Sequence, residues 1–281
     1  MEASAPIIHG CPTTTFTSDA SMTGWGATGN GYSTGGFFSE QERLLHINVL
    51  EAKAVLFGLR SLGKDLSGTH IKILSDNSAT VGAINNMGSS KSWDLNDTVF
   101  SIWDWTLEQD NWITASHIAG VLNTEADLES RRTADHTEWM LDRDTFDRVI
   151  KALGFQPEID LFATRINNQL PRFVSFRPDP EAETIDAFTI SWDKLDFYAF
   201  PPFICIARIL QKIQIEGGKG ILIVPDWPNQ PWYNRYQEML IDELILYPRE
   251  FQLSLPQEGE KRHPLIRTLR LRAGLVTATD L

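Results

Sequence analysis

The first half of the chain changes in hydrophobic periodicity, from short alternating runs to longer helical repeats. Between about residues 13 and 36, β-branched and aromatic residues are punctuated by glycines, which predicts two or three strands joined by hairpins. Further along, some segments repeat apolar residues at helical spacing and others are short apolar runs. The pattern predicts helices over residues 48–62, 78–86, 93–107 and 124–131, and strands over residues 71–74 and 112–117. Strands followed by alternating helices and strands indicate a mixed α/β layer structure.

A polar, turn-prone segment, RRTADHTEW, separates the two halves and marks the predicted domain boundary. Beyond it, the pattern predicts helices over residues 144–153 and 204–213, and strands over residues 158–162, 198–200 and 219–224. The run KGILIV in the last strand is continuous and apolar, which is typical of a buried parallel strand. We therefore expect an N-terminal extension (1–12), a mixed-sheet domain (13–135), a second, Rossmann-like α/β domain (142–256) and a C-terminal tail (257–281).

The composition is that of an ordinary globular chain. Of its 281 residues, 42% are hydrophobic and 22% charged, and the length suffices for two modest domains. The two cysteines, Cys11 and Cys205, are too few for a disulfide framework. No apolar run reaches membrane-spanning length and no signal-peptide pattern is present, so we expect an intracellular protein with no membrane partner.

The charge balance constrains how the chain can meet nucleic acid. A net charge of −12 argues against a protein that grips phosphates with its own basic surface. Either the acidic residues converge on bound divalent cations, or a neighbouring polypeptide supplies the positive charge. Basic residues gather near the C-terminus, and we interpret them as part of a solvated tail. They are Lys261, Arg262, Arg267, Arg270 and Arg272.

Four carboxylates stand at the ends of predicted strands or on predicted helices: Asp19, Glu51, Asp76 and Asp127. Glu51 lies on the apolar stripe of its helix, where a carboxylate costs free energy unless a cation compensates it. Each acid has an ordinary alternative: a solvated strand end for Asp19, a salt bridge for Glu51, a helix cap for Asp76 and a helix-dipole contact for Asp127. Taken together, they predict a nuclease that holds two divalent cations.

The surroundings of these acids, DASMTGWGA, NVLEAKAVL, SDNSATV and HIAGVLNTEADLESR, resemble the retroelement ribonuclease H (RNase H) domain over about residues 13–132. The resemblance implies an RNase H-like mixed sheet with flanking helices, and cleavage of the RNA strand of RNA–DNA hybrids. It places Asp19, Glu51, Asp76 and Asp127 at the catalytic, metal-binding positions. The implied cofactors are two Mg²⁺ ions, with Mn²⁺ as the alternative at an all-oxygen site.

The same resemblance suggests residues that meet the substrate. His117 and Gly120 match the family's His-x-x-Gly turn, and Asn123 matches the Asn shortly before the last acid. For His117 we favour a structural role over a catalytic one. The candidate substrate contacts are Gly24, Asn77, Ser78, His117 and Asn123.

The second half contains EIDLFATRINNQLPRF, DAFTISW and YAFPPFICIARILQKI, which resemble phage-type DNA adenine methylases. In that family a polar residue before the Pro-Pro pair grips the target adenine, but here the position is Phe200, which cannot accept a hydrogen bond. We therefore interpret AFPPF as a rigid strand-to-helix turn. The glycine-rich turn that would hold the methionine end of S-adenosylmethionine is replaced by Ala163 and Thr164, so we expect no binding of this cofactor. The methylase-like positions are Asp160, Asn167, Phe200, Pro201, Pro202 and Phe203.

The nuclease-then-methylase order resembles the polyprotein of DIRS-type, tyrosine-recombinase retrotransposons. It implies a reverse transcriptase domain of the same polyprotein as partner, and a location in the cytoplasm or nucleus. Two alternatives stay open: an active DNA adenine methylase, and a domesticated, catalytically silent interaction module. In a non-catalytic second domain, four aromatic residues serve either as docking side chains or as core. They are Trp192, Trp227, Trp232 and Tyr233.

Overall fold

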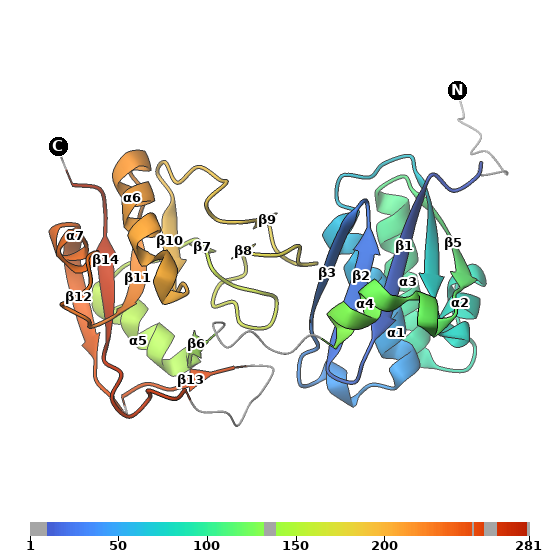
Figure 1. Ribbon diagram of the computed structural model, residues 1–281, viewed down its shortest axis with the longest axis horizontal. Helices are drawn as coiled ribbons and strands as arrows, with labels where there is room; N and C mark the ends of the chain where they lie inside the picture. The colour runs from blue at the N-terminus through green and yellow to red at the C-terminus, as the bar shows by residue number, and fades with distance from the viewer. Residues whose placement is uncertain (1–9, 132–138, 249, 256–262, 280–281) are drawn as a thin grey trace. The chain divides into compact units, whose positions relative to one another are not determined.

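The computed structural model of the chain describes residues 10–131, 139–248, 250–255 and 263–279, which form two compact units (Figure 1). The first unit holds the described residues up to 131 together with Pro178–Glu181, and the second holds the others. Thr34 Oγ1 donates a hydrogen bond to the Pro178 carbonyl, which ties this short segment to the first unit. Most of the predicted boundary segment RRTADHTEW, and residues 1–9 of the predicted extension, lie outside the described residues.

A five-stranded sheet forms the centre of the first unit. Strands β1, β2 and β3 make an antiparallel meander, as the glycine-punctuated pattern predicts. Strands β4 and β5 add in parallel on the other side of β1, which gives the order β3-β2-β1-β4-β5. The bounds are β1 (Thr14–Ala20), β2 (Gly24–Gly29), β3 (Tyr32–Phe37), β4 (His70–Ser75) and β5 (Trp112–His117).

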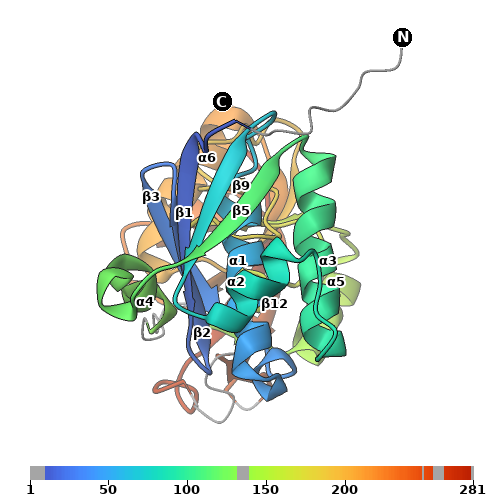
Figure 2. The ribbon, with the colours of Figure 1, turned by 90° about the vertical axis from the view of Figure 1, so that its right-hand side faces the viewer.

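Helices cover both faces of this sheet. Figure 2 shows α1, α2 and α3 on one side of the strands and α4 on the other. Helix α4 lies so close against β2 that a Cβ at Gly26 would come 2.1 Å from the carbonyl oxygen of Ala126. The missing side chain of Gly26 therefore makes this packing possible. The bounds are α1 (Ile47–Leu62), α2 (Ser78–Asn85), α3 (Trp93–Glu108) and α4 (Thr124–Ser130), with 3₁₀ turns η1 (Glu42–Leu44) and η2 (Gly120–Leu122).

The second unit is built on another mixed sheet, with the order β12-β14-β11-β10-β7. Phe197 and Leu222 face one core with α6 and α7, whereas Tyr198 and Ile221 face a second core with α5. The main elements are α5 (Arg143–Leu153), β7 (Ile159–Asp160), β10 (Asp196–Ala199), α6 (Ile206–Glu216), β11 (Lys219–Pro225), α7 (Tyr233–Glu238), β12 (Leu240–Leu246) and β14 (Leu271–Val276). Shorter elements are β6 (Met140–Leu141), β8 (Val174–Ser175), β9 (Thr184–Ile185), β13 (Leu253–Ser254) and η3 (Phe203–Cys205).

Two expectations for the second half need correction. β11 runs parallel to β10, as predicted, but antiparallel to β14 on its other side. The predicted solvated tail instead supplies β14, which lies between β11 and β12. Arg272 can enter the sheet because Asp226 and Glu243 both neutralise it, at 2.7 Å each. Lys261 and Arg262 of the predicted tail lie outside the described residues.

The predicted fold class is confirmed: a mixed sheet flanked by helices is followed by a second α/β unit. The predicted helices and strands of the first half appear with bounds shifted by at most one residue. No helix in the described ranges combines the length and apolar character needed to cross a membrane.

Candidate metal centre

Asp19, Glu51 and Asp76 converge in the first unit. Each can offer one carboxylate oxygen, and these oxygens lie within 4.8 Å of one another. β1 and β4 are parallel neighbours with Thr17 opposite Leu74, so the same register brings Asp19 next to Asp76 two residues further on. Glu51 reaches this point from the second turn of α1, which packs on β1 and β2.

Burial makes the charges of this cluster costly. Asp19 is 6% exposed and Glu51 is 5% exposed. Burial, followed by the charges of Asp19 and Asp76, raises the pKa of Glu51 to about 8. Burial also raises the pKa of Asp19, although a hydrogen bond from Ser130 opposes this. Three close carboxylates therefore cannot all stay ionised at neutral pH unless positive charge joins them.

The donor set fits a divalent cation. All three side chains offer carboxylate oxygens, the ligands that Mg²⁺ and Mn²⁺ prefer. Glu51 Oε2 is buried and has no hydrogen-bond partner within the described ranges, so it is available as a ligand. Asp76 is only half-buried, which leaves the cluster accessible from its side. The fold thus brings together an acidic cluster, Asp19, Glu51 and Asp76, that could hold a divalent cation.

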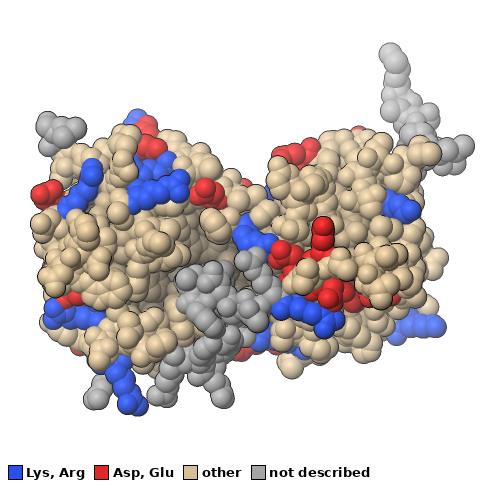
Figure 3. Space-filling view, viewed as in Figure 1, with Lys and Arg blue, Asp and Glu red and all other residues tan. Residues whose placement is uncertain are grey.

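The fourth predicted ligand, Asp127, is not part of this close cluster. It lies in the first turn of α4, its side chain is 38% exposed, and its Oδ1 accepts from Arg131 Nε at 2.5 Å. Its charge still contributes to the raised pKa of Asp19, so it stands near the site. Figure 3 shows acidic side chains gathered on the surface of the first unit around α4. The structure therefore groups three of the four predicted acids and pairs the fourth with an arginine.

Ser130 is a site residue that the sequence did not reveal. Its hydroxyl donates to Asp19 Oδ2 at 2.5 Å and also contacts the Asp127 carbonyl at 3.0 Å. It comes from the last residue of α4, 111 positions away from Asp19. No local pattern marks a serine for such a contact, because it depends on α4 packing across β1.

Two of the candidate substrate contacts are buried and serve the fold. Gly24 is buried, and a Cβ there would lie 2.7 Å from the Ser130 carbonyl oxygen, so its small size lets α4 pack. Asn123 is 2% exposed, and its Nδ2 donates to the Ser18 carbonyl at 2.8 Å. Burial and these contacts explain the two residue types within the fold, and a role of Gly24 and Asn123 in substrate binding stays a prediction.

The other matched positions lie around the acidic cluster. Ser78 is exposed at the start of α2, and His117 is exposed at the end of β5. The exposure of His117 does not support the structural role that we favoured for it. Asn77 caps α2 by accepting from Thr80 N, and it also donates to Asn48 Oδ1 at 2.9 Å. A Cβ on Gly120 would lie 2.9 Å from Asp76 Oδ2, which explains the glycine in this turn.

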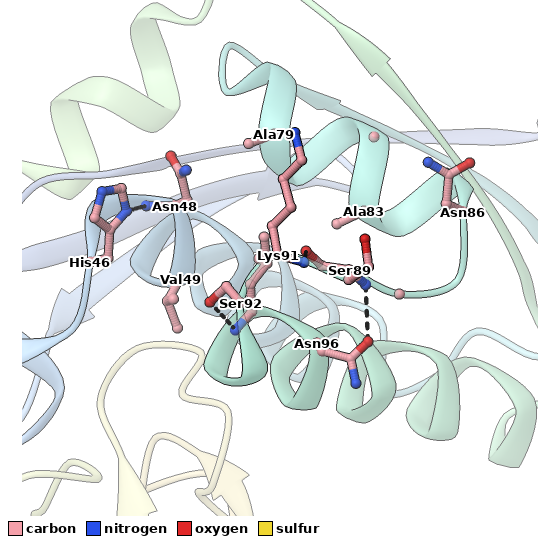
Figure 4. A pocket seen from close by; sticks show the side chains of 14 residues that line it. His46, Asn48, Val49, Ala79, Ala83, Asn86, Ser89, Lys91, Ser92 and Asn96 are labelled. Atoms are coloured by element: carbon pink, nitrogen blue, oxygen red, sulfur yellow. Dashed lines mark hydrogen bonds between the residues drawn. The ribbon is translucent and has the colours of Figure 1, made fainter.

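A polar groove of about 960 Å³ lies in the same unit, between the starts of α1 and α3 and one side of α2. Figure 4 shows Lys91 reaching across it towards Ala79, with His46 and Asn48 on the α1 side. His46 and Ser92 cap α1 and α3 respectively. Asn48 links the groove to the loop that follows Asp76, through its hydrogen bond with Asn77. The groove thus offers a cation and polar groups that suit an anionic chain.

In the second unit, the methylase-like polar residues are engaged in local structure. Asp160 is 2% exposed and accepts from the backbone N–H groups of Gln169 and Phe162. Burial raises the pKa of Asp160 to about 7, although the two hydrogen bonds act to lower it. Asn167 Oδ1 accepts from both the backbone N–H and the hydroxyl of Thr164, which closes a tight turn.

The AFPPF loop joins β10 to η3 and α6, as the strand-to-helix interpretation predicts. Phe200, Pro201, Pro202 and Phe203 line an apolar cavity of about 290 Å³ together with Trp139, Ile204, Leu253 and His263. Of the four aromatics considered for docking, Trp192, Trp232 and Tyr233 belong to the buried core, and Trp227 packs half-buried against the second core. The core interpretation is therefore confirmed for Trp192, Trp232 and Tyr233, and Trp227 packs on the core with part of its side chain exposed.

The chain was also compared with known proteins. No family model matches it, and no curated protein matches it. Among solved structures it is similar to RNase H1 from the halophilic archaeon Halobacterium salinarum NRC-1, with 14% identity and a TM-score of 0.34, over 41% of this chain and 91% of that chain. It is also similar to LC11-RNase H1 in complex with an RNA/DNA hybrid, with 16% identity and a TM-score of 0.35, over 42% and 93% of the two chains. A third similar structure is the N-terminal RNase H domain of a Mycobacterium tuberculosis protein, with 17% identity and a TM-score of 0.33, over 41% and 94%.

Proposed function

We propose that the first unit is a metal-dependent endoribonuclease that cleaves the RNA strand of RNA–DNA hybrids. The observation that carries this proposal is the convergence of Asp19, Glu51 and Asp76, two of them buried, with no ion pair to any of the three in the described part of the chain. A purely structural cluster would be expected to carry an internal cation, as a buried carboxylate is otherwise unstable. The order and surroundings of the acids, which resemble retroelement RNase H, supply the reaction class.

Asp19, Glu51 and Asp76 would hold two Mg²⁺ ions, with Mn²⁺ as the alternative, while Asp127, which is paired with Arg131, would support these ligands from the periphery. Such ions, when bound, supply a more acidic attacking water and stabilise the leaving 3′ oxygen. The protein's own residues prepare the ligands. Ser130 fixes one oxygen of Asp19, and the absence of a side chain at Gly120 leaves room for the Asp76 carboxylate. Glu51 would be ionised at neutral pH only once the cations balance its neighbours.

The polar groove supports a double-stranded substrate. Lys91 and the capped starts of α1 and α3 would contact the phosphates of one strand, while the acidic cluster acts on the other. Preference for RNA at the cut would come from contacts to its 2′-hydroxyl groups. We expect Lys91→Ala to raise KM more than it lowers kcat and to make KM less sensitive to salt. An unchanged KM at every salt concentration would remove the groove from the proposal.

We also propose that the chain acts beside a reverse transcriptase domain within a DIRS-type retrotransposon polyprotein, in the cytoplasm or nucleus. The support is the order of the RNase H-like and methylase-like motifs. A partner that supplies basic surface would also resolve the conflict between a net charge of −12 and a polyanionic substrate.

The test is cleavage of a hybrid with labelled RNA by the full chain in Mg²⁺, with EDTA and the Asp76→Asn variant as controls. We expect cleavage of the RNA strand that disappears in EDTA and in the variant, because the change removes a ligand charge with little change in volume. Cleavage that persists in Asp76→Asn would contradict the assigned site. A folded wild-type protein that binds Mg²⁺ but leaves the hybrid intact, even with a reverse transcriptase domain added, would favour the catalytically silent alternative.

A further inference from the structure

Helix α3 carries an apolar stripe on the side that faces away from its own core. Its buried side packs Leu95, Val99 and Ile102 against the first unit. On the outward side, Trp93 is 85% exposed, Phe100 is 50% exposed and Leu107 is 62% exposed. Single exposed apolar side chains are ordinary on a protein surface, but three of them in line on one helix require an explanation.

The spacing of these residues aligns them. Trp93, Phe100 and Leu107 follow each other at intervals of seven, and seven residues make almost two full turns of an α-helix. The three side chains therefore form one line along the helix, about 21 Å long. A seven-residue apolar repeat is the pattern by which one helix packs along another. In Figure 2, α3 is the long helix on the side of the sheet opposite α4.

The charges beside the stripe have a single sign. Asp97, Asp104 and Glu108 follow one edge of it, Asp94 lies further round, and all four are exposed. The sequence of α3, WDLNDTVFSIWDWTLE, contains no Lys or Arg. Within the described ranges, none of these four carboxylates forms an ion pair. An acidic edge along an apolar line selects a partner with the opposite charge.

We propose that the stripe of Trp93, Phe100 and Leu107 docks a basic amphipathic helix of another polypeptide, whose apolar residues cover the stripe while Lys or Arg side chains face Asp97, Asp104 and Glu108. The charge argument disfavours a second copy of this chain, because two α3 helices would bring their acidic edges together. None of the three stripe residues belongs to the acidic cluster or lines the polar groove, so the inference does not depend on the nuclease activity.

The test uses two synthetic peptides of about three heptads with the same Leu and Ile stripe, one flanked by Lys and Arg and the other by Glu. Each carries a dye, and its fluorescence anisotropy is followed on titration with the full-length protein. We expect the basic peptide to bind and the acidic one not to bind, with affinity falling as NaCl rises from low to high concentration. Failure of the basic peptide to bind, or equal binding of both peptides, overturns the proposal.

Variants then locate the binding surface. The triple variant Trp93→Gln, Phe100→Gln, Leu107→Gln should lose at least about tenfold in affinity, since aromatic anchors dominate such contacts. Tyr32→Gln, another exposed aromatic of the same unit, is the matched control and should bind as the wild type does. The double variant Asp97→Lys, Asp104→Lys should transfer the preference to the acidic peptide. Unchanged affinity in a triple variant with a normal thermal transition overturns the assignment.

Sedimentation velocity of the protein alone tests whether a second copy of the chain covers the stripe. We expect a sedimentation coefficient that does not depend on concentration and is equal in the wild type and the triple variant. A wild-type dimer that the triple variant dissociates would assign the stripe to a second copy of the chain and overturn the basic partner.

Discussion

The two units bury carboxylates in opposite ways. In the second unit, Asp226 accepts hydrogen bonds from Arg272 and from the Tyr233 hydroxyl, and Arg270 pairs with it as well. Burial alone would raise the pKa of Asp226, but these partners outweigh it and lower the pKa. In the first unit, the pKa values of Asp19 and Glu51 are raised, and neither residue forms an ion pair in the described part of the chain.

The contrast separates structural acids from candidate functional ones. A buried acid that is paired with a basic side chain of the protein has its charge balanced, and removing either partner leaves an uncompensated charge. A buried acidic cluster without a basic partner destabilises the folded state, and a cation that binds there raises the free energy of unfolding. The same residue type therefore predicts opposite consequences of mutation in the two units.

The largest effect is expected from removing a buried acid that forms no ion pair within the described residues. Asp19→Asn should lower kcat for hybrid cleavage roughly a thousandfold, because about 4 kcal/mol of charge stabilisation is lost with the ligand. Single-turnover assays in Mg²⁺ measure this. A matched variant, Asp193→Asn, changes an exposed acid of the second unit and should leave kcat unchanged.

Breaking the internal pair of the second unit should affect stability and not cleavage. Arg272→Met leaves Asp226 and Glu243 without their shared partner, and should cost about 3 kcal/mol of unfolding free energy. Urea unfolding measures the loss, with Arg267→Met as the control in the same segment. An equal stability of the two variants would show that the ion pairs contribute nothing to the fold.

In the first unit, removing an acid should stabilise the metal-free protein. The folded state keeps the Glu51 proton up to about pH 8, whereas the unfolded chain releases it near pH 4.5, so stability falls as pH rises between these values. Glu51→Gln should remove this slope and gain roughly 2 kcal/mol at pH 8 in EDTA. Mg²⁺ should raise the Tm of the wild type more than that of the variant. A Tm that Mg²⁺ shifts equally in both proteins would exclude Glu51 as a ligand.

Asp127 should give a smaller effect than the three converged acids. Because it is already paired with Arg131, Asp127→Asn should lower kcat by about tenfold, the size expected for a residue that supports ligands from the periphery. The same cleavage assay compares it directly with Asp19→Asn. If the two variants lose activity equally, Asp127 leaves Arg131 and acts as a full ligand in the working enzyme.

The second unit should not bind S-adenosylmethionine. Ala163 and Thr164 stand where a glycine-rich turn would hold the cofactor, and Asp160 and Asn167 are engaged in hydrogen bonds with neighbouring residues. Calorimetric titration of the full chain should give no heat beyond dilution. A micromolar affinity would reinstate the methylase interpretation.

Much of the first unit could be predicted because its signals are local. Helix α1 and strand β5 are visible in the period of their apolar residues, and Glu51 is conspicuous as an acid on an apolar stripe. Strand β14 could not be predicted in the same way. Arg272 and Gly274 interrupt its apolar pattern, and the carboxylates that make Arg272 acceptable lie 29 and 46 residues earlier.

The sequence by itself determined the element order of the first unit, the presence of two α/β units and the four acids to consider, because periodicity and residue chemistry are properties of short segments. Only the tertiary structure decided that Asp19, Glu51 and Asp76 converge, that Asp127 pairs with Arg131, and that Ser130 holds Asp19. The tertiary structure also shows that the apolar stripe on α3 is exposed and does not belong to the core. These outcomes depend on strand register and helix packing between distant segments, which no local pattern contains.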